Sequence, residues 1–297
     1  MRSLLIVCAL ILVTSAATSQ QRSIPLVVSS EWLSDHMNDQ DLVVLQVAFN
    51  RAEYRAGHIP GARFLWFNGL ALSTPDLSTE MPPVEQADTL LESVGVTSRS
   101  NIVLVFGGAN VSIATRMLLA FTYFGFGDRV TFLDGGFEKW KSEKRQVSTQ
   151  TPGATRSSLQ LTVHPEVLAT AEMVRNSLTN PDVAIVDARN KNFYDGDGGG
   201  ILRQGHIKGA KSIPFSAVVD SLNRFKDMTS LQKLFENAGI KKGDRLITYC
   251  HVGQQATVVY LVARLLGYEA AVYDGSFEDW NTRGEEYPVE KTPKPKS

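Results

Sequence analysis

Residues 245–267 read RLITYCHVGQQATVVYLVARLLG, and this segment decides the fold. Its apolar start, Arg245 to Tyr249, is typical of a strand buried on both faces of a parallel sheet. A short loop follows Cys250, and the apolar run from Gln255 to Leu266 predicts a helix that ends at Gly267. Strand, loop and helix in this order predict an α/β domain.

The chain also contains an internal repeat. GHIPGA at 57–62 recurs as GHIKGA at 205–210, LESVGV at 91–96 recurs as FENAGI at 235–240, and DGGFEKW at 134–140 recurs as DGSFEDW at 274–280. The three motifs keep their order and nearly their spacing. So long a period indicates two copies of a globular domain, not a solenoid of short repeats.

We therefore expect an α/β fold with two tandem domains, each a parallel sheet with helices on both faces and right-handed crossovers. The expected parts are a first domain at 24–145, a linker at 146–161, a second domain at 162–290 and a tail at 291–297. In the second domain, further strands are expected at Val183–Val186 and Ala270–Tyr273, and helices at Pro165–Leu178 and Ser230–Ala238.

Residues 1–20 have the pattern of a secretory signal peptide. A basic start is followed by an apolar run, Leu4 to Val13, that is too short to cross a bilayer, and then by small residues at 15–17. A buried N-terminal helix is the alternative interpretation. A signal peptide would direct export to the periplasm or out of the cell, and its cleavage would remove Cys8, which leaves Cys250 as the single thiol.

The composition is that of an ordinary globular protein. With 43% hydrophobic and 21% charged residues over 297 positions, it excludes extensive disorder and fits two domains. Lys and Arg number 30 against 31 Asp and Glu, so no excess positive charge attracts nucleic acid or an anionic membrane. We expect no nucleic-acid partner, no membrane attachment after signal cleavage, and a monomer.

Cys250 stands where the carboxyl end of a parallel strand meets the N-terminus of a helix, the edge at which sites of α/β sheets form. The free N–H groups and the dipole of the helix favour a thiolate and lower the pKa of a cysteine there. Gly253 lets the loop fold tightly around one anionic atom. The segment predicts a site that holds a thiolate, or a persulfide formed on it; the alternative is a small buried cysteine without chemistry.

Taken together, four features resemble the rhodanese family of sulfurtransferases. They are the paired Gly-His-Ile-x-Gly-Ala segments, Asp187-Ala188-Arg189 after the first strand of the second copy, the Cys250 loop, and the paired Asp-Gly-x-Phe-x-x-Trp segments. The resemblance covers nearly all of the chain after the expected signal peptide. It implies two tandem rhodanese-like domains, of which only the second is catalytic.

Comparison of the two copies agrees with a single catalytic domain. When residues 103–106 are laid on 246–249, Gly107 falls opposite Cys250. The positions opposite Asp187 and Arg189 are Gln46 and Ala48. The first copy lacks all three candidate groups, so we expect it to be structural and to wall the site.

The resemblance implies a double displacement. The Cys250 thiolate attacks the sulfane sulfur of a donor such as thiosulfate or 3-mercaptopyruvate, and the persulfide then passes its outer sulfur to cyanide or a thiol. These small molecules are the expected partners. No metal or organic cofactor is implied, and no metal-ligand spacing stands out among the His and Cys residues.

Seven further residues are candidates for substrate binding. Arg189 can contact the anionic group of the donor through a bidentate guanidinium, and Asp187 can orient Arg189 or a loop N–H. A structural ion pair is the alternative role for these two residues. The other five candidates are the loop residues His251, Val252, Gly253, Gln254 and Gln255.

Other functions stay open at this point. The loop His-Val-Gly-Gln-Gln matches neither the thiosulfate nor the mercaptopyruvate pattern of the family, so the donor is undecided. A Cys-dependent phosphatase or arsenate reductase needs Arg six positions after the cysteine, where this chain has Ala256. A non-enzymatic sulfur carrier or binding module is the other alternative. The Gly-rich insertion at 195–200 either covers the site or is a surface loop.

Overall fold

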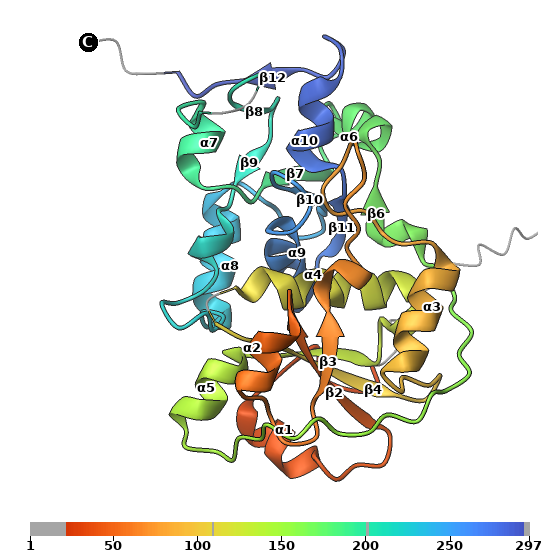
Figure 1. Cartoon of the computed structure of the whole chain (residues 1–297). Coiled ribbons are helices and arrows are strands. Elements are labelled where there is room, and N and C mark those ends of the chain that lie inside the picture. Colours follow the sequence, from red (N-terminus) through yellow and green to blue (C-terminus); the bar gives the residue numbers. More distant parts are fainter. Residues whose placement is uncertain (1–21, 109, 200–201, 294–297) are drawn as a thin grey trace, which may run out of the picture.

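The computed structural model describes residues 22–108, 110–199 and 202–293 (Figure 1). The expected signal peptide, with Cys8, lies outside the described residues, as do residues 294–297 of the tail. Within the described ranges, each half of the chain builds a five-stranded sheet. No helix in these ranges is long and apolar enough to span a bilayer.

Every strand pairing in the two large sheets is parallel. The first sheet has the order β1 (Val27–Val28), β5 (Val130–Leu133), β4 (Asn101–Phe106), β2 (Leu42–Ala48), β3 (Arg63–Trp66). The second has the order β6 (Leu168–Ala169), β11 (Glu269–Tyr273), β10 (Arg245–Tyr249), β7 (Val183–Asp187), β9 (Lys211–Ser212). A small antiparallel pair joins β12 (Val289–Glu290) to β8 (His206–Ile207).

Helices cover both faces of each sheet, which is why the central strands are almost wholly apolar. The helices of the first half are α1 (Ser30–His36), α2 (Arg51–Ala56), α3 (Val84–Ser93), α4 (Val111–Phe121) and α5 (Gly136–Ser142). Those of the second half are α6 (Ala171–Ser177), α7 (Lys191–Asp195), α8 (Met228–Asn237), α9 (Ala256–Leu265) and α10 (Ser276–Thr282). Short helical turns are η1 (Phe67–Gly69), η2 (Thr122–Phe126), η3 (Pro165–Val167) and η4 (Phe215–Ala217).

Most elements predicted for the second half agree with the structure. The strands expected at 183–186, 245–249 and 270–273 are β7, β10 and β11, each within one residue at its ends. The helices expected at 230–238 and 255–266 are α8 and α9. Helix α8 begins two residues early because Asp227 caps it, accepting a hydrogen bond from the Ser230 N–H.

The helix predicted at Pro165–Leu178 is wrong in its first half. Residues 165–167 form the turn η3, and the next two residues form β6, which pairs with β11. Helix α6 begins only at Ala171, because the Thr170 side chain accepts a hydrogen bond from the Met173 N–H and caps it there. Pairing at the sheet edge has overridden the local helical pattern.

The two halves repeat contacts as well as motifs. Tyr54 stacks on His58 with ring centroids 3.9 Å apart, and Tyr194 stacks on His206 at 3.7 Å. In each pair the imidazole Nδ1 lies against the tyrosine carbonyl oxygen, and the tyrosine hydroxyl donates to an alanine carbonyl. The Gly-rich insertion begins directly after Tyr194, so it lengthens the connection to His206 while the stack is kept.

The segment 146–161 is mostly exposed but is tied to the first half (Figure 1). The backbone of Ser148 pairs with that of His58, and Leu159 is buried. The Leu159 N–H donates to Glu92 Oε1 at 2.9 Å. These contacts fix the path of the chain before it enters the second half.

The two halves meet through α4 and α9, which lie side by side at the centre of the molecule (Figure 1). Every residue of α4 is buried, and one cluster of buried apolar side chains continues from the first half into the second. The hydroxyl oxygens of Thr115 and Thr257 are hydrogen-bonded across this seam at 2.7 Å. Because each helix is covered by the other half, separating the halves would expose apolar surface on both.

Leu118 lies one turn after Thr115 on the same face of α4 and has no exposed surface. Leu118→Ala should destabilise the whole chain by about 2–5 kcal/mol, because it leaves a cavity in a core that both halves share. Scanning calorimetry should show one unfolding transition in the wild type and one, at lower temperature, in the variant. Two separate transitions, of which only one moves, would contradict a shared core.

Candidate active site

Cys250 follows β10 directly and precedes the loop 251–255 that leads into α9. The residue has no exposed surface. Its N–H donates to Ser276 Oγ at 3.1 Å, and its carbonyl oxygen accepts from the Phe277 N–H at 3.0 Å. The start of α10 therefore fixes the backbone of the candidate nucleophile on both sides.

Ser276 makes this contact from an uncommon backbone conformation, with φ at 51°. The matching position of the first half is Gly136, with φ at 55°, which glycine adopts without steric cost. The serine hydroxyl accepts the Cys250 N–H and donates to the Tyr273 carbonyl at 2.9 Å. Strain of this kind is concentrated at functional sites, and here it places a hydroxyl beside the one thiol of the described chain.

The loop after Cys250 packs closely against the rest of the second half. Gly253 has φ at 76°, and a Cβ there would lie 2.4 Å from the Asp274 carbonyl oxygen, so only glycine fits. Among the described residues, the backbone N–H groups of 251–255 find no hydrogen-bond acceptor. Consecutive free N–H groups at the start of a helix can bind a thiolate, a persulfide or an anionic donor.

Asp187 and Arg189 form an ion pair in which neither side chain is exposed. Arg189 Nη2 lies 2.6 Å from Asp187 Oδ2, and Nη2 also donates to the Gly205 carbonyl at 2.7 Å. The Tyr249 hydroxyl donates to the same carboxylate at 2.7 Å. The guanidinium lies 4.0 Å from the centre of the Phe277 ring. Arg189 is therefore anchored, and its use in donor binding stays a prediction.

One nitrogen of this guanidinium is nevertheless free. Arg189 Nη1 is buried and has no hydrogen-bond partner among the described residues. Burial lowers the pKa of Arg189, but the hydrogen bonds and charge of Asp187, with smaller contributions from Tyr249 and Cys250, outweigh burial and raise it. The group stays charged, and Cys250 lies within reach of its field.

His251 is half-buried next to the thiol. Its ring packs edge-on against Phe193 of α7, with centroids 4.5 Å apart. Desolvation, and then the charge of Arg189, lower the pKa of His251, while Asp187 opposes them. His251 is therefore neutral at neutral pH and can either donate or accept a hydrogen bond.

The first half supplies residues to this site that the sequence did not reveal. Arg116 of α4 has no exposed surface, pairs with the Asp274 carboxylate, and donates to the Gly253 carbonyl at 3.3 Å. The Thr79 hydroxyl donates to the Val252 carbonyl, and the Ser78 hydroxyl donates to Glu278 Oε1 at 2.7 Å. One signal could have pointed to Arg116, since it is the single charge in the otherwise apolar or small-polar helix 111–121.

The remaining loop candidates lie together but differ in role. Gln254 Nε2 donates to Ser112 Oγ of the first half at 2.8 Å, so this side chain faces the seam between the halves. Val252 and Gln255 are half-buried, and Gly253 is buried. The structure thus brings residues 250–255 and Arg189 into one region, walled in part by the first half.

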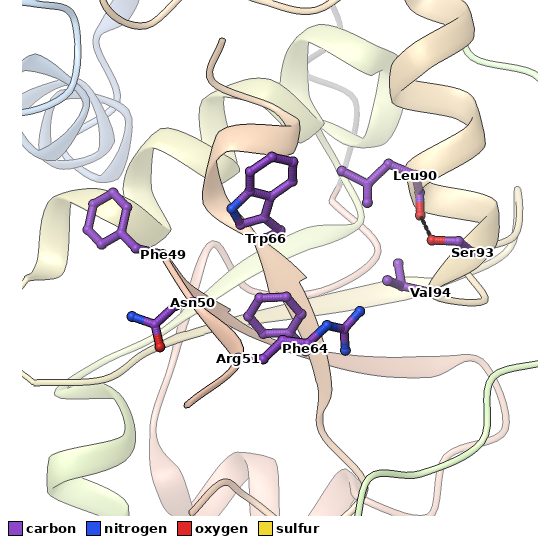
Figure 2. A pocket seen from close by; sticks show the side chains of 8 residues that line it. All are labelled: Phe49, Asn50, Arg51, Phe64, Trp66, Leu90, Ser93 and Val94. Atoms are coloured by element: carbon purple, nitrogen blue, oxygen red, sulfur yellow. Dashed lines mark hydrogen bonds between the residues drawn. The ribbon is translucent and has the colours of Figure 1, made fainter. Parts of the chain in front are cut away.

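A separate hollow of about 300 Å³ lies in the first half (Figure 2). The aromatic side chains of Phe49, Phe64 and Trp66 line it, with Leu90 of α3 opposite. The Ser93 hydroxyl at its rim donates to the Leu90 carbonyl at 2.7 Å. No thiol lines this hollow, and none of the seven candidate binding residues does.

No group of three or more His, Cys, Asp or Glu side chains among the described residues could hold a metal ion.

Comparison with known proteins places the chain in a family. The family model of the rhodanese-like domain matches residues 29–143 and again 170–283, so the chain belongs to the rhodanese family. The thiosulfate sulfurtransferase of Azotobacter vinelandii is 28% identical over 87% of this chain and 94% of that protein. The sulfur carrier protein TtuD of Thermus thermophilus is 29% identical over 86% of this chain and 93% of that protein.

A solved structure shows the same fold. The 3-mercaptopyruvate sulfotransferase SseA from Escherichia coli matches with a TM-score of 0.77 and 24% sequence identity, over 85% of this chain and 99% of that one. Two tandem parallel-sheet domains of the rhodanese type are therefore the architecture of this protein, as its sequence predicts.

Arg189→Ala should destabilise the protein by about 3–5 kcal/mol, because it leaves the Asp187 carboxylate buried without a counter-charge. The paired variant Asp187→Asn/Arg189→Met, which removes both charges, should recover most of this loss. Urea unfolding of the three proteins measures both effects. A loss below about 1 kcal/mol in the single variant would mean that water reaches the site freely and that the pair is not truly buried.

Proposed function

We propose that this protein is a sulfurtransferase that moves a sulfane sulfur from thiosulfate or 3-mercaptopyruvate to a thiol or to cyanide through a persulfide on Cys250. One arrangement carries the proposal. Within the part of the chain that the structure describes, one thiol lies at the C-terminal end of a parallel strand, among backbone N–H groups that find no acceptor there and close to a buried arginine.

The residues of the second half account for both steps. The Cys250 thiolate attacks the outer sulfur of thiosulfate, the S–S bond of the donor breaks, and sulfite leaves with the electron pair. The persulfide anion is stabilised by the loop N–H groups from 251 to 255. An acceptor thiolate or cyanide then attacks the outer sulfur and releases the Cys250 thiolate, so the sulfane sulfur passes from donor to acceptor and Cys250 itself undergoes no net oxidation.

Arg189 can bind the anionic group of a donor. Its free Nη1 can donate to a sulfonate or carboxylate oxygen while Asp187 holds the other nitrogens in a fixed plane. The neutral imidazole of His251 adds a hydrogen-bonding group without a second charge. Since Cys250 has no exposed surface, donor entry requires the side chains or the first-half loop around it to move apart.

A sulfur carrier is the second candidate, favoured by the identity to TtuD and by the enclosed thiol. A carrier forms the persulfide and keeps it for a protein acceptor. An enzyme also turns over with a small acceptor. Steady turnover with thiosulfate and cyanide therefore separates the two functions.

Cys250→Ser should abolish sulfur transfer and leave the fold intact, because a hydroxyl is a far weaker nucleophile than a thiolate at neutral pH. Intact mass after incubation with thiosulfate, and separately with 3-mercaptopyruvate, should show a gain of about 32 Da, one sulfur atom, on the wild type only. The donor that gives this gain is the substrate. Residual turnover above about a hundredth of the wild-type rate in the variant would exclude the covalent mechanism.

We also propose that residues 1–20 direct export and are removed. The basic start, the short apolar run and the small residues at 15–17 support this proposal. The protein isolated from outside the cytoplasm should begin within residues 18–21. An N-terminus at Met1 in that fraction would refute cleavage.

A further inference from the structure

The first half contains a cavity of about 390 Å³ at the position that matches the Cys250 site of the second half. Gln46 and Ala48 of β2 line it, together with Gly107, which follows β4. The strand registers place Gln46 opposite Asp187, and Ala48 lies two residues after Gln46 as Arg189 lies two residues after Asp187. The same registers place Phe106 opposite Cys250, so the sequence-based match of Gly107 with Cys250 is wrong by one residue and Gly107 matches His251. The volume is within the usual range for small-molecule sites.

Gln46 takes over part of the bonding that the ion pair provides in the second half. Its Nε2 donates to the Gly57 carbonyl at 3.2 Å, just as Arg189 Nη2 donates to the matching Gly205 carbonyl. A carbonyl can only accept, so the nitrogen of the amide must face Gly57 and the oxygen must face away. Gln46 is 3% exposed, and its Oε1 is buried without a partner among the described residues.

The cavity lies where the first half lacks the side chains that form the site of the second half. Ala48 replaces a side chain that carries a guanidinium, and at Gly107 and Gly108 a Cβ would meet no atom within 4 Å. Gln46, whose Oε1 is unsatisfied, is one of the residues that line the same cavity. A buried acceptor without a donor costs free energy until a donor reaches it.

The charge around the cavity favours a cation. Glu53 and Glu138 line it with Lys141. Lys141 Nζ lies 2.9 Å from Glu138 Oε2 and also lies over the Phe137 ring. The charges of Lys141 and Glu138 therefore compensate each other. Among the described residues, the side-chain partner of Glu53 is the neutral Asn50 amide. The lining therefore carries one uncompensated negative charge.

We propose that this cavity of the first domain binds a small molecule that carries a guanidinium group. The guanidinium occupies the space that the Arg189 side chain fills in the second domain and donates to Gln46 Oε1. The rest of the ligand lies towards Glu53. The first domain would thus be a second binding domain, with a preference for cations where the catalytic domain takes anions.

Calorimetric titration of the full chain tests this with three probes that share a butyl chain: butylguanidinium, the neutral but equally planar N-butylurea, and the compact cation butylammonium. Butylguanidinium should bind at least about tenfold more tightly than the other two, since it alone combines charge with a planar set of donors. Gln46→Leu should weaken its binding by about tenfold or more, because it removes the acceptor. Ala48→Arg, which fills the cavity with an internal guanidinium, should abolish it.

Cys250→Ser is the matched control and should leave butylguanidinium binding unchanged. Conversely, Ala48→Arg should keep sulfur transfer, which shows that the variant is folded. Binding that survives both Gln46→Leu and Ala48→Arg, binding lost in Cys250→Ser, equal affinity for the three probes, or no binding of butylguanidinium would each overturn the proposal.

Discussion

The ion pair between Arg116 and Asp274 holds the site together. Arg116 belongs to the first half and Asp274 to the second, and the same guanidinium also reaches the carbonyl of Gly253 in the loop beyond Cys250. A buried charge must be paired. If the two halves shifted against each other, the charge of Arg116 or of Asp274 would be left without its partner. The contact of α4 with α9 buries apolar surface, whereas this ion pair fixes the position of one half relative to the other.

Gene duplication has given the two halves one framework and different chemistry. The stacked tyrosine and histidine pairs are kept in both. At the strand ends the halves diverge: one has a charged pair and a thiol, and the other an amide and glycines. Strand pairing uses backbone groups and not the side chains at these positions, so the side chains can change while the sheet is preserved. This explains why a site can be lost from one half without loss of its fold.

The sequence was sufficient for the parts that depend on local pattern. The buried strands β7 and β10, the position of Cys250 and the repeat itself all follow from runs of apolar residues and recurring motifs. The helix expected from Pro165 failed because β6 gains its stability from pairing with β11, about a hundred residues away, which no local pattern reports. Arg116 was missed for the same reason, as its partner lies in the other half. The burial of Cys250 also depends on contacts between the halves.

The enclosure of Cys250 has a consequence for the redox chemistry of the protein. Sulfenic acid, disulfide and alkylated products all form only when a reagent touches the sulfur atom. The described chain offers no second cysteine for a disulfide, and the closed site keeps foreign thiols and peroxide away. The rate at which a small alkylating reagent consumes the thiol thus reports how often the side chains or the first-half loop around Cys250 move apart. Oxidative damage is limited by the same opening that admits the donor.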